Sequence, residues 1–352
     1  MVMPFSNATV IVRPFLAAVG ALEREKQKLH ASIVTTLAQS TPGWVDVKTD
    51  DISVYHVGGA MTNLIFKVSK PSGENNDVLV RIYGEGTESF FSRKDEIRLF
   101  QMLSKVDMGV GLLGEFRNGR VESFIYGSTF TNKEMRKPEW SSCIAAKMRK
   151  FHSVNVDIDR SPRFLTAIEH FLQVAREKCV GEKFENVVNF DQYDEDLKEL
   201  RALVEQVPSP VVLCHNDLQY GNIMRTDDGV VLIDFEYSAY NPRGYDIGNH
   251  FCEWSYDYHK TINPHLGDFK RYPTVDEQRH FCRAYLAGEN KEPVSEDEIE
   301  QLRLEANTYA MATHLFWSLW GFIQASQSEI DFDFISYATC RYDAFKTRVT
   351  LQ

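Results

Sequence analysis

The residues with the clearest chemical potential lie near the middle of the chain. Residues 215–222 read HNDLQYGN and place Asn222 five positions after Asp217, and an apolar run ends in Asp234 twelve positions later. Phosphoryl transfer needs a carboxylate to direct a hydroxyl proton, and an amide oxygen and a second carboxylate to hold Mg²⁺ beside ATP. Either pattern alone is compatible with ordinary turn and strand-end residues. The ordered pair favours phosphoryl transfer.

The elements that must position these residues form two groups. Short alternating or β-branched runs predict strands at 52–57, 63–69, 78–83, 112–116 and 120–125, the last two joined by the hairpin signal Asn118-Gly119. Helical spacing is expected over 10–22 and 90–103, with a connection at 40–51. From residue 140 onward, helical patterns cover 140–154, 162–178, 192–206, 274–287, 297–326 and 330–347, and strand-like runs interrupt them at 211–214, 222–226 and 229–235.

These elements predict an α+β, protein-kinase-like fold with two lobes. The N-lobe, residues 1–126, would contain an N-terminal helix and a small antiparallel sheet with one helix. The C-lobe, residues 127–352, would be larger and mainly helical.

Bulk properties narrow the function classes. A net charge of −11 over 352 residues argues against a nucleic-acid partner, which requires a basic face. The six cysteines form no CxxC pair, so we expect reduced thiols and a cytoplasmic protein. No run reaches the roughly 20 apolar residues of a membrane span.

Three segments around the loop, 215–222, 233–241 and 243–254, resemble the choline/ethanolamine kinase family, and the likeness runs from about Ser53 to Phe345. The resemblance implies that Asp217 is the catalytic base and that Asn222 and Asp234 bind Mg²⁺, with Glu236 assisting. It also implies that Asp246 braces the loop. We expect His215 to organise the loop by hydrogen bonding rather than to carry protons.

The nucleotide side should lie in the N-lobe. The segment 57–63 is an ordinary Gly-Gly turn by itself, but the resemblance implies a phosphate loop containing Gly58, Gly59, Thr62 and Asn63. Arg81 occupies the position of the kinase lysine and can clamp phosphates with two donors. Its expected partner is Glu96, with Glu88 as the alternative. Backbone groups from Glu122 to Ile125 are expected to contact adenine.

The substrate side should lie in the C-lobe. A quaternary ammonium offers no N–H donor, so aromatic faces and a nearby carboxylate bind it best. Aromatic residues at helical spacing are usually core, but the resemblance implies an ammonium pocket. Its residues would be Asp217, Gln219, Glu253, Tyr258, Trp317, Trp320, Phe332 and Tyr337. Gln219 and the segment 256–258 favour choline, whereas 330–334 leans towards ethanolamine.

The sequence therefore predicts ATP-dependent phosphorylation of choline to phosphocholine, the first step of phosphatidylcholine synthesis. An ethanolamine or dual choline/ethanolamine kinase is the alternative. An aminoglycoside-type kinase would share the loop but not Glu253 or the two tryptophans. A non-catalytic pseudokinase binding module is disfavoured because Asp217, Asn222 and Asp234 are all present. The resemblance is compatible with a homodimer.

Overall fold

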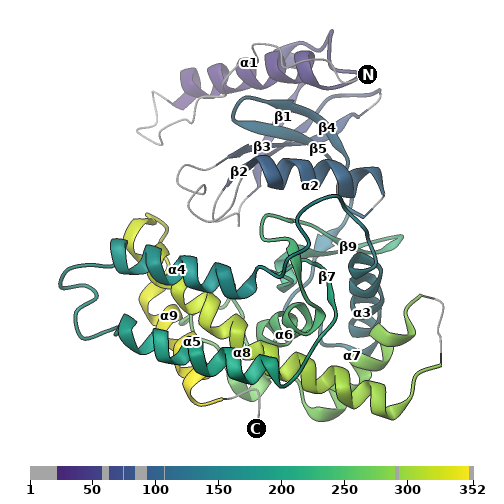
Figure 1. Ribbon diagram of the computed structural model, residues 1–352. Coiled ribbons are helices and arrows are strands. Elements are labelled where there is room, and N and C mark those ends of the chain that lie inside the picture. Colours follow the sequence, from purple (N-terminus) through teal and green to yellow (C-terminus); the bar gives the residue numbers. More distant parts are fainter. Residues whose placement is uncertain are drawn as a thin grey trace. The chain divides into compact units, whose positions relative to one another are not determined.

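The computed structural model describes residues 22–57, 63–73, 75–83, 93–106, 108–289 and 293–348 (Figure 1). The chain divides into two compact units, 1–126 and 127–352. Several predictions fall outside the described residues, namely the helix over 10–22, the loop positions Gly58, Gly59 and Thr62, and the side chains of Glu88 and Glu96.

The first unit is built on a five-stranded antiparallel sheet in the order β1-β2-β3-β5-β4. Its strands are β1 (Ser53–Val57), β2 (Asn63–Ser69), β3 (Asp77–Tyr83), β4 (Leu112–Phe116) and β5 (Gly119–Ser123). β4 and β5 form the hairpin predicted from Asn118-Gly119, with Phe116 opposite Gly119. A short 3₁₀ helix (Thr49–Asp51) precedes β1, and α2 (Arg93–Lys105) connects β3 to β4.

The helix α1 (Leu22–Ser40) covers the sheet. The sequence did not predict this helix, because the expected N-terminal helix ends at residue 22 and the expected connection begins at residue 40. Ile33, Val34 and Leu37 lie in one buried cluster with Val68 and Val80 of the sheet. The charged residues at the start of α1 obscure the helical spacing of its apolar residues in the sequence. The apolar face becomes regular only in the second half of the helix, where it packs on the strands.

The second unit is mainly helical, which confirms the predicted α+β fold class. Its long helices are α3 (Pro138–His152), α4 (Phe164–Lys178), α5 (Phe190–Glu205), α6 (Arg243–Glu253), α7 (Val275–Ala287), α8 (Glu296–Gln327) and α9 (Phe334–Lys346). Two small antiparallel sheets accompany them. One pairs β7 (Val211–Cys214) with β10 (Ala239–Pro242), and the other contains β6 (Ser128–Thr129), β8 (Ile223–Thr226) and β9 (Gly229–Leu232). The sequence does not predict α6, β6 or β10.

The helix α8 forms the centre of this unit. A capping box between Ser295 and Glu298 fixes its start, and every residue from Glu305 to Ala325 is buried. A helix that is buried on all sides must be enclosed by neighbouring elements, and α4, α6, α7 and α9 pack against it. Despite its length, α8 is not apolar enough to cross a membrane, and neither is any other helix in the described part of the chain.

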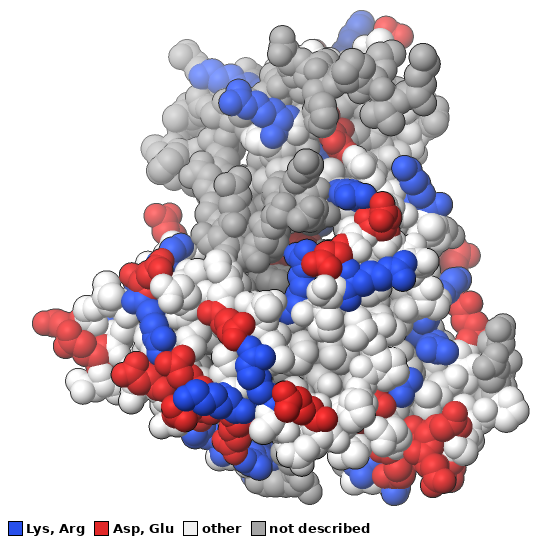
Figure 2. All heavy atoms as spheres, in the orientation of Figure 1, with Lys and Arg blue, Asp and Glu red and all other residues white. Residues whose placement is uncertain are grey.

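Charged side chains of both signs are interspersed on the face shown in Figure 2. Surface ion pairs of the second unit include that of Arg176 with Asp194, at 2.7 Å. The coloured residues on this face do not form the continuous basic surface that a nucleic acid requires.

Candidate active site

The loop between β7 and β8 is anchored by one buried carboxylate. Asp246 of α6 accepts hydrogen bonds from the backbone N–H groups of His215 and Asn216, both at 2.7 Å, and from Nε2 of His152 at 2.8 Å. Burial opposes ionisation of Asp246, but its hydrogen bond and charge interaction with His152 outweigh burial and lower its pKa. The charged carboxylate therefore braces the loop, in the position that the family resemblance implies.

Asn216 turns the chain directly before Asp217. Its φ of 66° lies in the left-handed region, which asparagine adopts more readily than most residues. Its Nδ2 donates to the Tyr237 carbonyl at 2.8 Å, and Nδ2 of Asn241 donates to its Oδ1 at 3.1 Å. These bonds hold the turn against the segment that leads into β10.

His215 connects the two halves of the predicted catalytic constellation. Its Nδ1 accepts from the Asp217 backbone at 3.3 Å, so Nε2 carries the proton and donates to the Ile233 carbonyl at 2.9 Å. Burial lowers the pKa of His215, which keeps the ring neutral. With both nitrogens engaged, this side chain organises the loop and has no free position for proton transfer.

Asp217 and Asn222 face each other across the loop. The Asn222 amide Nδ2 donates to both the backbone carbonyl and Oδ2 of Asp217, each at 2.8 Å. The Ile233 N–H donates to the Asn222 carbonyl at 3.0 Å, which brings the next residue, Asp234, beside the loop. The structure thus gathers three of the predicted phosphoryl-transfer residues in the second unit.

This part of the unit concentrates negative charge. The pKa of Asp217 lies well above its usual range because of burial and the charges of Glu253, Asp234 and Glu236, in that order. A divalent cation would relieve this repulsion. Carboxylate and amide oxygens are its preferred donors, and among the described residues no donor reaches Oδ1 of Asn222. The residues therefore fit Mg²⁺.

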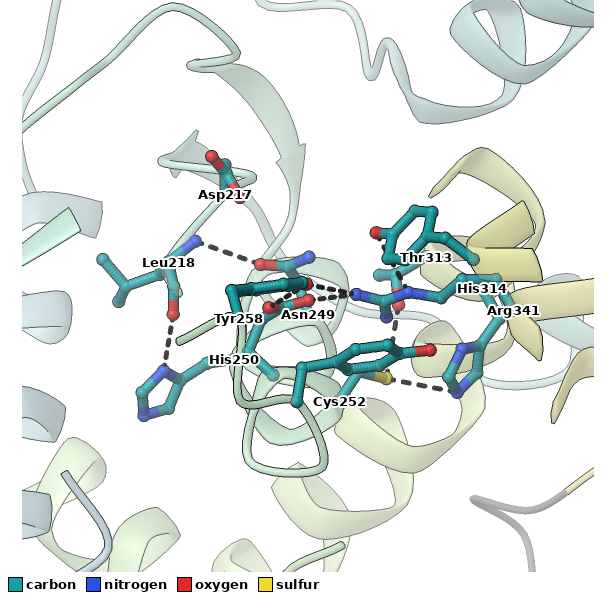
Figure 3. A network of polar contacts seen from close by, with 12 residues as sticks. Asp217, Leu218, Asn249, His250, Cys252, Tyr258, Thr313, His314 and Arg341 are labelled. Carbon is teal, nitrogen blue, oxygen red and sulfur yellow. Dashed lines mark hydrogen bonds and ion pairs between the residues drawn. The ribbon is translucent and has the colours of Figure 1, made fainter. Parts of the chain in front are cut away.

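Helix α6 also holds the loop at Leu218, the residue after Asp217 (Figure 3). Leu218 donates its N–H to Oδ1 of Asn249 at 3.0 Å, and its carbonyl accepts from Nδ1 of His250 at 2.8 Å. Burial lowers the pKa of His250 to about 4, so the ring is neutral. Its Nε2 then accepts from the indole of Trp254 at 3.2 Å. Both backbone groups of Leu218 are thereby fixed by consecutive residues of one helix.

Four of the five predicted aromatic residues come together, joined by one that the sequence does not predict, while Tyr258 stacks on Tyr256 instead. Trp317 and Trp320 of α8 are 5.4 Å apart between ring centroids, and Tyr337 of α9 lies 6.1 Å from Trp320. Phe332 lies 5.8 Å from Tyr337. The additional residue is Tyr237, whose ring is 5.2 Å from that of Trp317 and whose hydroxyl accepts from Nε1 of Trp320 at 2.8 Å. We call these five residues the aromatic wall.

The aromatic wall lies close to the acidic residues. After burial, the charges of Glu236 and Asp217 are the largest contributions that raise the pKa of Tyr237. Trp317 and Trp320 are each 6% exposed and Tyr337 is buried, whereas Tyr237 and Phe332 are half-buried. A cation held against these rings would be largely desolvated, which strengthens cation–π attraction.

Two other predicted substrate residues have protein partners. Glu253 pairs with Arg341 of α9 through Oε1, and its Oε2 accepts from the Tyr258 hydroxyl at 2.9 Å. Gln219 caps the short 3₁₀ helix Tyr220–Asn222 by accepting from the Gly221 N–H at 2.6 Å. Arg341 is absent from the sequence predictions, because an arginine in a helix is ordinarily a solvated surface residue.

In the first unit, Glu122 of β5 forms a buried ionic cluster with two arginines. Its Oε1 accepts from Nε of Arg81 and from Nε of Arg120, each at 2.7 Å. Burial raises the pKa of Glu122, but the two guanidinium groups outweigh this and lower it to about 2. Arg81 therefore has an acidic partner, Glu122, that the sequence did not assign to it. The predicted pairing with Glu96 stays a prediction, because the side chain of Glu96 is outside the described residues.

The remaining predicted nucleotide residues lie at strand ends of the same unit. Asn63 is buried at the start of β2, opposite Tyr83 of β3. Glu122 is in register with Leu79 and Leu112, so its backbone belongs to the sheet. Ile125 follows β5 without regular secondary structure and is half-buried.

The architecture and the loop define a protein with a kinase fold. The solved structure of the Plasmodium vivax ethanolamine kinase matches with a TM-score of 0.79 and 25% identity, covering 92% of this chain and 90% of that one. The sequence model of the choline/ethanolamine kinase family matches residues 54–346. The chain therefore belongs to the choline/ethanolamine kinase family, whose members use ATP.

Similar proteins carry both substrate names. A probable choline kinase of Arabidopsis thaliana is 36% identical over 330 residues, which is 92% of this chain and 93% of the relative. The choline/ethanolamine kinase of Homo sapiens is 37% identical over 321 residues, covering 86% of this chain and 81% of the relative.

Proposed function

We propose that this enzyme transfers the γ-phosphoryl group of Mg-ATP directly to the hydroxyl of choline. The observation that carries the proposal is the presence, in one compact unit, of the Asp217–Asn222 pair and the aromatic wall. Asp217 is the proposed base, and the wall is the proposed site of the quaternary ammonium.

Each group has a defined proposed role. Asp217 orients the hydroxyl through its carboxylate and takes up its proton as the new P–O bond forms. Asn222 and Asp234, with Glu236 assisting, would hold Mg²⁺, which neutralises charge on the phosphates when bound. The bond between the γ-phosphorus and the leaving oxygen of ADP breaks in the same in-line displacement, without a phosphoenzyme.

The nucleotide roles in the first unit remain proposals as well. Arg81 is proposed to bind phosphate oxygens, with Gly58, Gly59, Thr62 and Asn63 supplying backbone and side-chain donors. Its pairing with Glu122 supports this role, because a buried carboxylate fixes the orientation of the guanidinium. Backbone groups up to Ile125 are proposed to contact adenine.

We favour choline over ethanolamine as the substrate because the wall is aromatic and Glu253, the acidic residue predicted for the pocket, already has protein partners. A dual choline/ethanolamine kinase is the second candidate. The family membership and the charges of Asp234 and Glu236 favour it, since these carboxylates attract either ammonium ion.

The test is release of ADP by the purified protein with Mg-ATP and choline, ethanolamine or no amine. Choline-dependent release well above that with ethanolamine would support the proposal. Release with ethanolamine alone would retain the chemistry of Asp217 and refute the assignment of the amine. No release with either amine would favour a binding module.

We also propose a cytoplasmic location and a homodimeric assembly. All six cysteines are free thiols, four of them buried, as in proteins of reducing compartments. Cell fractionation tests the location. Gel filtration with light scattering tests the assembly.

A further inference from the structure

Arg341 is a fully buried cation. Figure 3 shows it beside Tyr258, within the network that also contains Leu218 and His250. Its guanidinium lies 4.0 Å from the ring centroid of Tyr256 and 5.2 Å from that of Tyr337. It donates through NH2 to Glu253 and, at 3.3 Å, to the Tyr258 hydroxyl, and through Nε to the Tyr337 hydroxyl at 3.1 Å. Aromatic faces and one carboxylate thus surround a cation that belongs to the protein itself.

The consequence for Glu253 is that both carboxylate oxygens are engaged. Oε1 accepts from Arg341 and Oε2 accepts from Tyr258, and the charge of Arg341 balances that of Glu253. Glu253 is only 2% exposed, so water cannot compete for these bonds. A carboxylate that is paired with a buried guanidinium and already accepts at both oxygens attracts an ammonium N–H less strongly than a free carboxylate does.

This matters differently to the two amines. A primary ammonium has three N–H donors that need acceptors when it leaves water, whereas a quaternary ammonium has none. A site that withholds its carboxylate therefore penalises ethanolamine more than choline. Sites that match or deny a substrate's hydrogen bonds discriminate far more strongly than apolar sites.

Arg341 also connects Glu253 to the aromatic wall. The Tyr337 hydroxyl accepts from Nε of Arg341, while the Tyr337 ring packs against Trp320 and Phe332. One guanidinium therefore fixes the carboxylate and one ring of the wall in the same arrangement.

We propose that Arg341 is a positioning residue that sets the preference for choline over ethanolamine, by neutralising Glu253 and holding Tyr337 in the aromatic wall. This inference rests on the proposed function. It goes beyond it by assigning amine selectivity to a residue that the substrate does not contact.

The experiment measures kcat/KM for choline and for ethanolamine in the wild type, Arg341→Met and Arg341→Lys. Methionine fills the volume but frees the Glu253 carboxylate. We expect the choline-to-ethanolamine ratio to fall about 10-fold or more, mainly through KM, since Asp217 is untouched. Lysine retains the charge but cannot donate to Glu253 and Tyr337 as a fork, so a smaller fall is expected.

Two further variants separate selectivity from stability. The double variant Arg341→Met with Glu253→Gln removes both charges and should return the ratio towards the wild-type value. Arg243→Met breaks a comparable ion pair with the buried Glu305, formed at 2.8 Å and 2.9 Å away from the aromatic wall. It should lower the melting temperature without changing the ratio.

The outcomes distinguish this inference from the proposed function. A wild type inactive with both amines would refute the proposed function, and the inference with it. If the wild type is active but Arg341→Met and Arg341→Lys both keep its choline-to-ethanolamine ratio of kcat/KM, only the role of Arg341 is overturned. If the methionine variant does not fold, the lysine variant alone decides in the same way.

Discussion

Replacing Asp246 with asparagine removes one of the two oxygens that anchor the catalytic loop. The carboxylate accepts from two backbone N–H groups and from His152, and it is completely buried. An asparagine has one acceptor oxygen and an NH₂ group, so at least one loop N–H would face another donor. A buried donor without a partner costs about 1–3 kcal/mol, and the lost charge-assisted bonds add to this.

We therefore expect Asp246→Asn to lower stability by about 3 kcal/mol, which corresponds to a fall in melting temperature of about 6–12 °C for a unit of this size. We expect the substitution to lower the reaction rate as well as the stability. Asp246 holds the residues immediately before Asp217, and misplacing a reacting group by about 1 Å costs on the order of 100-fold in rate. We expect kcat with choline to fall by about that factor, with a smaller change in the KM for ATP.

Asp196 of α5 provides a matched control. It is also buried, at 1% exposed, and accepts from Tyr342 at 2.5 Å and Lys346 at 2.6 Å, but it does not contact the loop. Asp196→Asn should lower the melting temperature similarly while kcat stays within about 2-fold. If Asp246→Asn loses stability but keeps the kcat of the control, the brace does not position Asp217 and the reasoning is wrong.

Three other predictions test the remaining parts of the site. Asp217→Ala should reduce turnover by about 10² to 10⁴-fold with ATP binding by calorimetry largely retained, and near-normal turnover would exclude it as the base. Trp320→Ala should raise the KM for choline about 10-fold and that for ATP little, whereas equal changes would make it a core residue only. Glu122 has a folded pKa of about 2 against 4.5 for the free group, so its contribution to stability is complete above about pH 4.5 and is lost as the pH falls towards 2. Hydrogen exchange of β3 and β5 should show this acid sensitivity in the wild type and not in Glu122→Gln, and the same acid sensitivity in both proteins would assign it elsewhere.

The sequence predicted the five strands of the first unit well because their signals are local. The β2 segment Asn63–Ser69 and the β4 segment Leu112–Phe116 agree residue for residue, since alternation and turn residues define both ends. Helix α6 escaped prediction because it contains two glycines within an unusually polar sequence. Its helical conformation depends on packing against α8, which no local pattern reveals.

The residues of the candidate site also fall into those that the sequence could predict and those that it could not. Asp217, Asn222 and Asp234 were predictable because their chemistry and spacing are written in one stretch of chain. Arg341 and Tyr237 were not, since each acquires its role from burial beside residues that are distant in sequence. A buried charge is recognised only once the fold supplies its partner.

Helix α6 contacts both the loop and the surroundings of the proposed amine site. Asp246 near its start braces the loop, and Glu253 lies two turns later, about 10 Å along the axis. A Cβ added at Gly248 would lie 2.5 Å from the Ala306 carbonyl oxygen of α8, the helix that also carries Trp317 and Trp320. Only a glycine permits this close approach, so Gly248 allows α6, which braces the loop, to pack tightly on α8, which carries the two tryptophans. Because choline places its hydroxyl and its ammonium at the two ends of a short chain, the proposed roles of Asp217 and the aromatic wall depend on this packing of α6 against α8.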